Sequence, residues 1–190
     1  MSEETCVSAA ARGQLQMLQW LREHGCPWRE STCAAASSNG HLETLIWARE
    51  NGCPWDKNTC SNAARHGHLE ILQWAVMHGC PIDSETFADA ARMGRTQMLQ
   101  WMKDSKCPWN ASVCSSAASG GRFQVLKWLR EQGCPWNEQT CAQAASIGNL
   151  EILKWARTNG CPWNSTTIVY AKMNNHIDIV EWALANGCPE

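Results

Sequence analysis

Cysteine has the widest chemical range of any residue type in this chain, since thiolates bind metal ions and attack electrophiles, and paired thiols form disulfides. The 190 residues include 12 cysteines, which fall into two series with a spacing of 27 residues or a multiple of 27. The first series comprises Cys26, Cys53, Cys80, Cys107, Cys134, Cys161 and Cys188, and the second comprises Cys6, Cys33, Cys60, Cys114 and Cys141. This period predicts that equivalent cysteines occupy equivalent places in a repeated structural unit.

Three roles are open to these cysteines: metal ligand, disulfide partner or apolar core residue. Neighbours within one series would lie about 10 Å apart in stacked helical repeats, beyond the roughly 7 Å Cα limit of a disulfide, whereas pairs between the series, such as Cys26 and Cys33, could approach each other. Phe87 and Ile168 occupy two places of the second series, which indicates an apolar position. Neither Cys-x2-Cys nor His-x3-His spacing occurs. We expect buried, reduced thiols, with some disulfides under oxidising conditions as the alternative, and neither metal nor cofactor.

Tryptophan recurs with the same period, and its faces could bind cations or nucleic-acid bases. One series has no substitution and comprises Trp20, Trp47, Trp74, Trp101, Trp128, Trp155 and Trp182. The other series follows Cys-Pro and comprises Trp28, Trp55, Trp109, Trp136 and Trp163, with Ile82 in its third place. The first series falls among the apolar positions of a predicted helix and the second tolerates Ile, so we interpret both as core packing.

Patterns typical of catalysis do not occur in the sequence. It has no Gly-x-Ser-x-Gly, no glycine-rich phosphate loop, and no carboxylate pair that recurs at a buried position. Acidic residues such as Glu43 and Glu70 fall on the outward strip of a predicted helix, where they would be solvated. We expect no catalytic residues and no enzyme activity.

Each repeat contains two predicted helices, which the second repeat illustrates. On its first helix, Cys33, Ala36 and Gly40 follow the i, i+3, i+7 spacing of one face, and their small size allows another helix to approach closely. The second helix runs from about Leu42 to Asn51, and its apolar positions cover an arc of roughly 220°. An arc this wide suits a helix between two neighbours, so we predict that the helix pairs bury their surfaces by stacking on adjacent repeats.

The ends of the helices are also marked in the sequence. Asp or Asn precedes five of the first helices, where these side chains cap the amino terminus. These residues are Asp56, Asp83, Asn110, Asn137 and Asn164. Glycine ends most first helices, and Asn175 takes its place in the seventh repeat. Lys106 replaces the glycine after the fourth repeat's second helix, so we predict a positive φ at Lys106 that costs roughly 1 kcal/mol.

The stretch Asn39-Gly40-His41-Leu42-Glu43 is similar to the Asn-Gly-His-Leu-Glu core of ankyrin repeats, and the Gly-Cys-Pro-Trp segments resemble the end of that repeat. The resemblance extends through all seven units. It implies an all-α fold, an α-solenoid of seven helix-turn-helix (ankyrin-like) repeats, and binding of other proteins. Ankyrin repeats have about 33 residues, and the residues missing here fall mostly in the projecting hairpin. We therefore expect binding through helix faces more than through hairpin fingers.

The period accounts for the whole chain, so we expect a single repeat domain over 1–190. Its approximate repeats are 5–31, 32–58, 59–85, 86–112, 113–139, 140–166 and 167–190. The net charge of -2 offers no basic surface for nucleic acid. No apolar run approaches the roughly 18 residues of a membrane span, and the amino terminus lacks signal-peptide features. We expect an intracellular, cytoplasmic protein with neither a nucleic-acid nor a membrane partner.

Positions that vary while the rest of the repeat recurs are the best candidates for function. They form a strip on the first helices and the adjoining turns. The candidate partner-binding residues are Asn62, Arg65, His66, Asp89, Arg92, Met93, Gln143, Ile147 and Tyr170. We expect a non-enzymatic scaffold that binds a partner protein on this strip, and the alternative is a structural spacer or a fragment of a longer repeat array. Terminal repeats without polar caps also favour end-to-end self-association.

Overall fold

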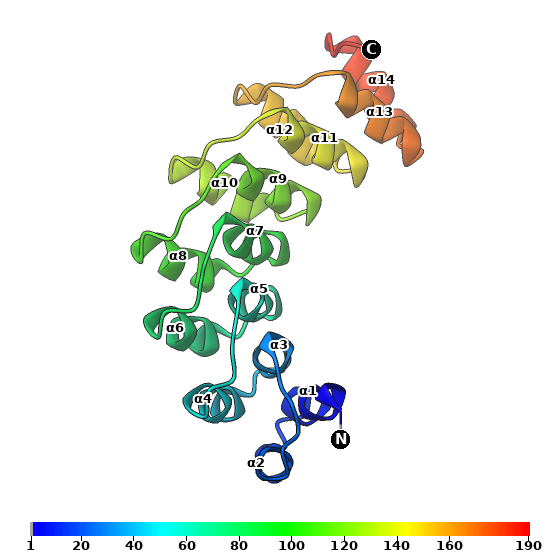
Figure 1. Ribbon diagram of the computed structural model, residues 1–190. Coiled ribbons are helices and arrows are strands. Elements are labelled where there is room, and N and C mark those ends of the chain that lie inside the picture. The colour runs from blue at the N-terminus through cyan, green and yellow to red at the C-terminus, as the bar shows by residue number, and fades with distance from the viewer. Residues whose placement is uncertain (1) are drawn as a thin grey trace. The chain divides into compact units, whose positions relative to one another are not determined.

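The structure is a computed structural model that describes residues 2–190, and this part of the chain forms fourteen α-helices and no strands (Figure 1). The helices are α1 (Glu3–Ala11), α2 (Leu15–Glu23), α3 (Glu30–Ser38), α4 (Leu42–Glu50), α5 (Lys57–His66), α6 (Leu69–Met77), α7 (Ser84–Met93), α8 (Thr96–Asp104), α9 (Ala111–Ser119), α10 (Phe123–Glu131), α11 (Glu138–Ser146), α12 (Leu150–Thr158), α13 (Ser165–Met173) and α14 (Ile177–Ala185). Odd numbers mark the first helix of a repeat and even numbers the second. The predicted fold class, an all-α solenoid of seven helix-turn-helix repeats, is confirmed.

The chain divides into two compact units, one that ends at Thr86 and one that extends from Phe87 to Glu190. In the first unit, α1 packs against α3 and α3 against α5. In the second unit, α9 packs against α11 and α11 against α13. These six first helices therefore lie side by side within their units, and each of the six also contacts the second helix of its own repeat, as α3 does with α4 (Figure 1).

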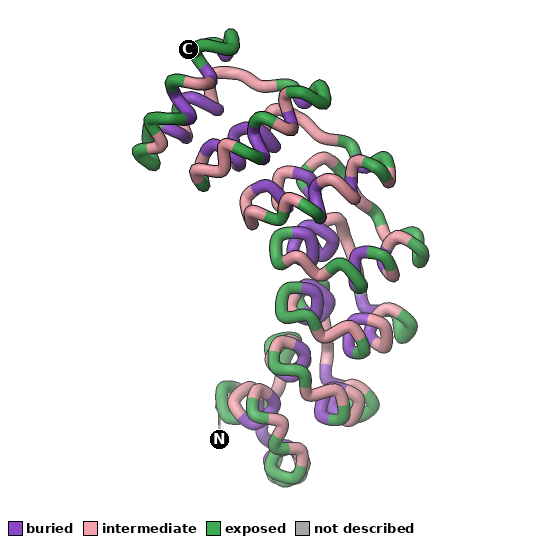
Figure 2. Tube along the Cα trace, turned by 180° about the vertical axis from the view of Figure 1, so that it is seen from behind, coloured by how far each residue is buried: buried purple, intermediate pink, exposed green. Residues whose placement is uncertain are grey.

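Small residues line the contacts between first helices, as predicted. Cys33, Ala36 and Ala63 have no exposed surface, so the backbones of neighbouring first helices approach closely. Second helices contribute larger side chains to the core, such as the fully buried Leu45 and Leu126. Figure 2 shows a buried strip on each helix and exposed residues at the turns.

The invariant tryptophans are not core residues, and this corrects the interpretation from the sequence. Trp20 is 48% exposed, and its six equivalents are half-buried. The apolar arc predicted for the second helix covers both the centre and the edges of its buried face, and side chains at the edges remain partly exposed. Leu45 and Ala48 occupy the centre on α4, both with 0% exposure, and the larger indole of Trp47 lies at the edge.

Amino-terminal caps form where Asp and Asn predicted them. In four repeats the side chain accepts a hydrogen bond from the backbone N–H two residues later; the capping residues are Asp56, Asn110, Asn137 and Asn164. Asp83 does the same in the fourth repeat, where its Oδ1 accepts from the N–H of Glu85 at 3.0 Å. The predicted left-handed positions are also confirmed, with φ of 57° at Lys106 and 59° at Asn175.

A histidine before the second helix connects consecutive repeats. Nε2 of His176 lies 3.2 Å from the carbonyl oxygen of Ser146, which belongs to the last turn of a first helix, where carbonyls lack intrahelical donors. The same contact recurs in the second and third repeats. Arg122 replaces the histidine in the fifth repeat and donates from Nε to the carbonyl of Arg92 at 3.1 Å. Each contact ties a second helix to the preceding repeat.

Candidate protein-binding surface

In the first unit, three candidate residues lie together on α5. Arg65 and His66 are exposed, and Asn62 is half-buried. Asn62 donates from Nδ2 to the carbonyl of Ala34 at 3.4 Å, and Nδ1 of His66 lies 2.9 Å from the carbonyl of Asn62 and 3.4 Å from Oγ of Ser38. Hydrogen bonds to α3 and within α5 therefore hold this polar group in place before any partner binds.

In the second unit, the candidate strip carries exposed apolar side chains. Met93 at the end of α7 is 38% exposed, Ile147 after α11 is 41% exposed and Met173 at the end of α13 is 73% exposed. Tyr170 adds a half-buried ring one turn before Met173. Large exposed apolar residues at equivalent or adjacent repeat positions are suited to burial against another protein.

Three further candidates differ in how accessible they are. Arg92 is exposed and Gln143 is half-buried. Asp89 is only 8% exposed, so its side chain does not belong to an exposed strip. The equivalent residue of the third repeat, Asn62, is half-buried, so this position of the first helix is less accessible than the positions of Arg65 and Arg92.

A second surface, on the second helices, carries a cation–tryptophan contact that the sequence analysis missed. The guanidinium of Arg49 lies 4.5 Å from the ring centre of Trp55, and that of Arg130 lies 4.1 Å from the ring centre of Trp136. Arg49 also donates to the carbonyl of Cys53 at 2.9 Å. Equivalent contacts occur in the first and sixth repeats. Each arginine therefore binds both the backbone and the ring of its own Cys-Pro-Trp turn.

The same tryptophans connect neighbouring repeats. Trp55 packs edge-to-face on Trp74 of the next repeat, with ring centres 5.7 Å apart. Three other junctions have the same geometry at 5.7 to 5.8 Å. The contact leaves a trace in the sequence, because Val76 replaces the arginine in the one internal repeat where Ile82 replaces the tryptophan. The arginine and the tryptophan are lost together in this repeat, and that paired loss is the sequence signal for their contact. We call this arginine–tryptophan contact the Arg–Trp clamp.

Surface hollows lie beside the Arg–Trp clamps, between consecutive second helices. One between α10 and α12 has a volume of about 410 Å³ and includes Arg130, Trp136 and Trp155 in its wall. Its equivalent between α2 and α4 has a volume of about 570 Å³ and includes Arg22 and Trp47. Because the clamp recurs in both units, these hollows are a property of the repeat.

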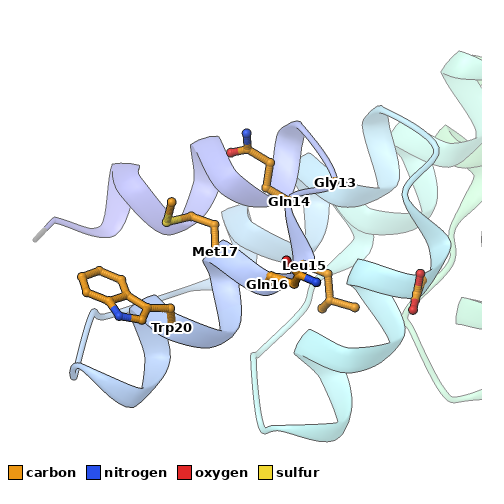
Figure 3. Close-up of a pocket in the computed structure, with 7 residues that line it drawn as sticks. Gly13, Gln14, Leu15, Gln16, Met17 and Trp20 are labelled. Carbon is orange, nitrogen blue, oxygen red and sulfur yellow. The ribbon is translucent and has the colours of Figure 1, made fainter.

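A larger hollow of about 810 Å³ lies on the first repeat and is lined by Gly13, Gln14, Leu15, Gln16, Met17, Trp20 and Glu43. Most of its labelled residues belong to α2 and to the turn before it (Figure 3). Met17 is 49% exposed and Trp20 is 48% exposed. In the second, third, sixth and seventh repeats the equivalent tryptophan packs on the Cys-Pro-Trp ring of the repeat before it.

The cysteines are buried, as predicted, but their partners differ from the predicted ones. Eleven are buried, Cys107 is partly exposed, and all 12 are free thiols. The thiol of Cys33 contacts that of Cys53, at the end of its own repeat, and not that of Cys26. Cys114 and Cys134 form the same contact. The two helices of a repeat run back along each other, which brings residues 20 positions apart together and separates those seven positions apart.

In the second repeat, the pKa values of the two paired thiols are shifted in opposite directions. The hydrogen bond to Cys53, together with burial, raises the pKa of Cys33 far above the usual range. The same hydrogen bond lowers the pKa of Cys53, because it stabilises the thiolate, and the charge of Arg22 adds to this effect against the cost of burial. Burial and contact with Cys26 raise the pKa of Cys6 to about 12.

Neither metal binding nor membrane insertion finds a structural basis in residues 2–190. No three His, Cys, Asp or Glu side chains in this part of the chain are grouped so that they could hold a metal ion. None of its helices combines the length and apolar character needed to cross a bilayer.

These repeats define the class of protein: the chain has the fold of an ankyrin-like repeat protein. Among solved structures it is similar to the ankyrin repeat domain of human ASB11, with a TM-score of 0.64 and 18% sequence identity over 83% of this chain and 84% of that one. The sequence matches no family model and no curated protein sequence. The structural likeness establishes the fold, and the roles of individual residues rest on the geometry above.

Proposed function

We propose that this chain is a non-enzymatic scaffold that binds a partner protein through the ends of its first helices. Ankyrin repeat domains generally mediate protein–protein interactions, and the fold is of that kind. The observation that supports the binding face is the exposure of Met93, Ile147 and Met173 at equivalent or adjacent repeat positions in the second unit. Burying such side chains in a complex would contribute about 25 cal/mol per Å² of apolar area.

The polar group on α5 would supply specificity to this binding. Arg65 and His66 present charge and hydrogen-bonding groups, and the contacts of His66 with Ser38 and Asn62 restrict the ring before binding. Restricting a side chain in advance lowers the entropy lost on association. We propose that the strip of the second unit binds apolar groups of a protein partner and that α5, by itself, binds polar groups.

A matched pair of variants tests the proposal. Met173 on α13 is 73% exposed and Met77 on the second helix α6 is 72% exposed, so Met173→Asp and Met77→Asp change the same residue type at the same exposure on different faces. Partners are captured from the native cell with each variant and with the unchanged chain, and folding is checked by circular dichroism. The proposal predicts that Met173→Asp loses specific partners that Met77→Asp retains.

Equal capture by both variants, with both folded, would refute this binding face and favour the structural spacer. The combined variant Asn62→Ala, Arg65→Ala, Arg92→Ala extends the test to the polar residues. We expect it to weaken capture without changing the helical signal, because these side chains are exposed or half-buried and lie outside the core.

A further inference from the structure

Buried thiol pairs recur within the repeats and have no part in the proposed binding surface. Cys33 and Cys53 are both 0% exposed, as are Cys114 and Cys134. In each pair one sulfur lies on the first helix, and the other lies in the Cys-Pro turn that ends the repeat. In the fifth repeat, Sγ of Cys114 lies 3.9 Å from the carbonyl oxygen of Cys134, and Sγ of Cys134 lies 3.7 Å from the carbonyl oxygen of Asn110, the residue just before α9. The turn cysteine and the first-helix cysteine are therefore neighbours.

We propose that these pairs are oxidation sites, at which a hydroperoxide converts the two thiols of one repeat into a disulfide. Contact between the thiols is seen in the first, second, fifth and sixth repeats, and the third repeat has cysteines at the same two positions. The assigned pairs are Cys6–Cys26, Cys33–Cys53, Cys60–Cys80, Cys114–Cys134 and Cys141–Cys161.

In the second and sixth repeats, the sulfur in the Cys-Pro turn has the partners that favour its reacting first. The thiol of Cys33 is the hydrogen-bond partner of Cys53, and the guanidinium of Arg22 adds positive charge nearby. Cys161 has equivalent partners in Cys141 and Arg157. These groups favour the thiolate, the form of cysteine that attacks an oxidant. The first-helix thiol keeps its proton and is held beside the reacting sulfur.

The chemistry is balanced with a hydroperoxide as the oxidant. The thiolate of the turn attacks one peroxide oxygen, the O–O bond breaks, and with hydrogen peroxide the leaving group is hydroxide, which takes up a proton as water. The resulting sulfenic acid is attacked by the first-helix thiol, the S–O bond breaks, the S–S bond forms and a second water leaves. Two sulfurs lose one electron each, and one peroxide gains two. A small oxidant suits sites that are closed to solvent.

Two repeats of the chain are natural controls. Phe87 and Ile168 occupy the first-helix position in the fourth and seventh repeats, with 0% and 2% exposure. Cys107 and Cys188 therefore lack the first-helix thiol that the other turn cysteines have. Oxidation of the folded chain should spare these two residues from intramolecular disulfides.

The experiment treats the intact folded chain with limiting hydrogen peroxide, then unfolds it, alkylates the remaining thiols and maps linked peptides by mass spectrometry. We expect the five assigned disulfides, with Cys107 and Cys188 alkylated. Cys33→Ile should leave Cys53 alkylated and the other links intact, since Ile168 already fills this position in the seventh repeat. Phe87→Cys should create a new link to Cys107.

Several results would overturn the proposal. Links between repeats, such as Cys26 to Cys33, would show that the contacts within repeats do not direct the reaction. Loss of Cys107 and Cys188 at the same rate as the paired cysteines would show that pairing gives no advantage. Unreacted pairs, or oxidation of single cysteines to sulfinic acid without disulfides, would show that the buried sites are not accessible to hydrogen peroxide.

Discussion

Replacing Gly148 with alanine should disturb a junction between repeats, and Gly160 provides the matched control. Both glycines have a left-handed backbone, with φ of 74° and 82°. A Cβ at Gly148 would lie 2.6 Å from Cε1 and 2.7 Å from Nδ1 of His176, whereas a Cβ at Gly160 would meet nothing within 4 Å. The two substitutions share the backbone strain, and only Gly148→Ala collides with a ring.

The expected losses in the free energy of unfolding follow from the backbone strain and from the contact with His176. Left-handed backbone costs a residue with a Cβ roughly 1 to 2 kcal/mol, and the loss of unfolded-state entropy on replacing glycine returns about 0.4 to 1 kcal/mol. We therefore expect Gly160→Ala to destabilise the fold by about 1 kcal/mol. At Gly148 the ring of His176 must move away from the carbonyl of Ser146, now 3.2 Å from Nε2, and losing that hydrogen bond adds about 1 kcal/mol.

Urea titration followed by far-ultraviolet circular dichroism measures the two free energies of unfolding. The excess cost at Gly148 should disappear when His176→Ala is introduced first, because the colliding ring is then absent; this comparison forms a double-mutant cycle. Equal costs for Gly148→Ala and Gly160→Ala would refute the role of the histidine contact. An excess that persists without His176 would do the same.

Three further predictions concern other parts of the repeat. Lys106→Gly should stabilise the fold by up to about 1 kcal/mol in the same urea titration, because it relieves a left-handed residue with φ of 57°. Arg130→Met and Trp136→Leu should show a coupling energy of about 0.5 to 2 kcal/mol in a double-mutant cycle, and additive costs would contradict the 4.1 Å cation–π contact. Burial raises the pKa of Asp83, but the ammonium of Lys57 and the backbone N–H groups at the helix start outweigh it, so the net pKa is lowered. A lowered carboxyl pKa stabilises the fold above the unfolded value and loses this effect as the pH falls through the folded value. The difference in urea midpoint between the unchanged chain and Lys57→Met should therefore shrink below about pH 4, and a pH-independent difference would contradict the ion pair.

Helix boundaries could be predicted from the sequence because local chemistry determines them. Asp and Asn side chains cap helices through N–H groups only two residues away, as at Asn137, and φ at Lys106 depends on the turn in which it lies. The burial of the cysteines was also predictable, since Phe87 shows that its position accepts an apolar ring. None of these predictions required knowledge of how one helix packs on another.

The features that were predicted wrongly depend on how one helix packs against another. A helical arc shows which residues face inwards, but it does not distinguish Leu45 in the centre from Trp47 at the edge. Spacing along the chain left open an approach of Cys26 to Cys33, whereas the antiparallel course of the two helices brings Cys53 to Cys33. Asp89 is only 8% exposed, although its variation between repeats and its polar character placed it on an exposed strip.

The two cysteine series are under different physical constraints, which accounts for their different tolerance of substitution. Phe and Ile replace the first-helix cysteine twice, but all seven repeats keep the cysteine of the Cys-Pro turn. In six repeats the turn thiol donates to the backbone carbonyl of the residue before its own first helix, as Cys161 does to Asn137 at 3.3 Å. A valine or isoleucine could fill this space but could not donate to the carbonyl, which would be left buried without this partner. The S–H group of the turn cysteine therefore has a structural role in its reduced form, whereas the packing at the first-helix position is also met by a larger apolar side chain, so that only the repeats that keep both cysteines can form the proposed disulfide.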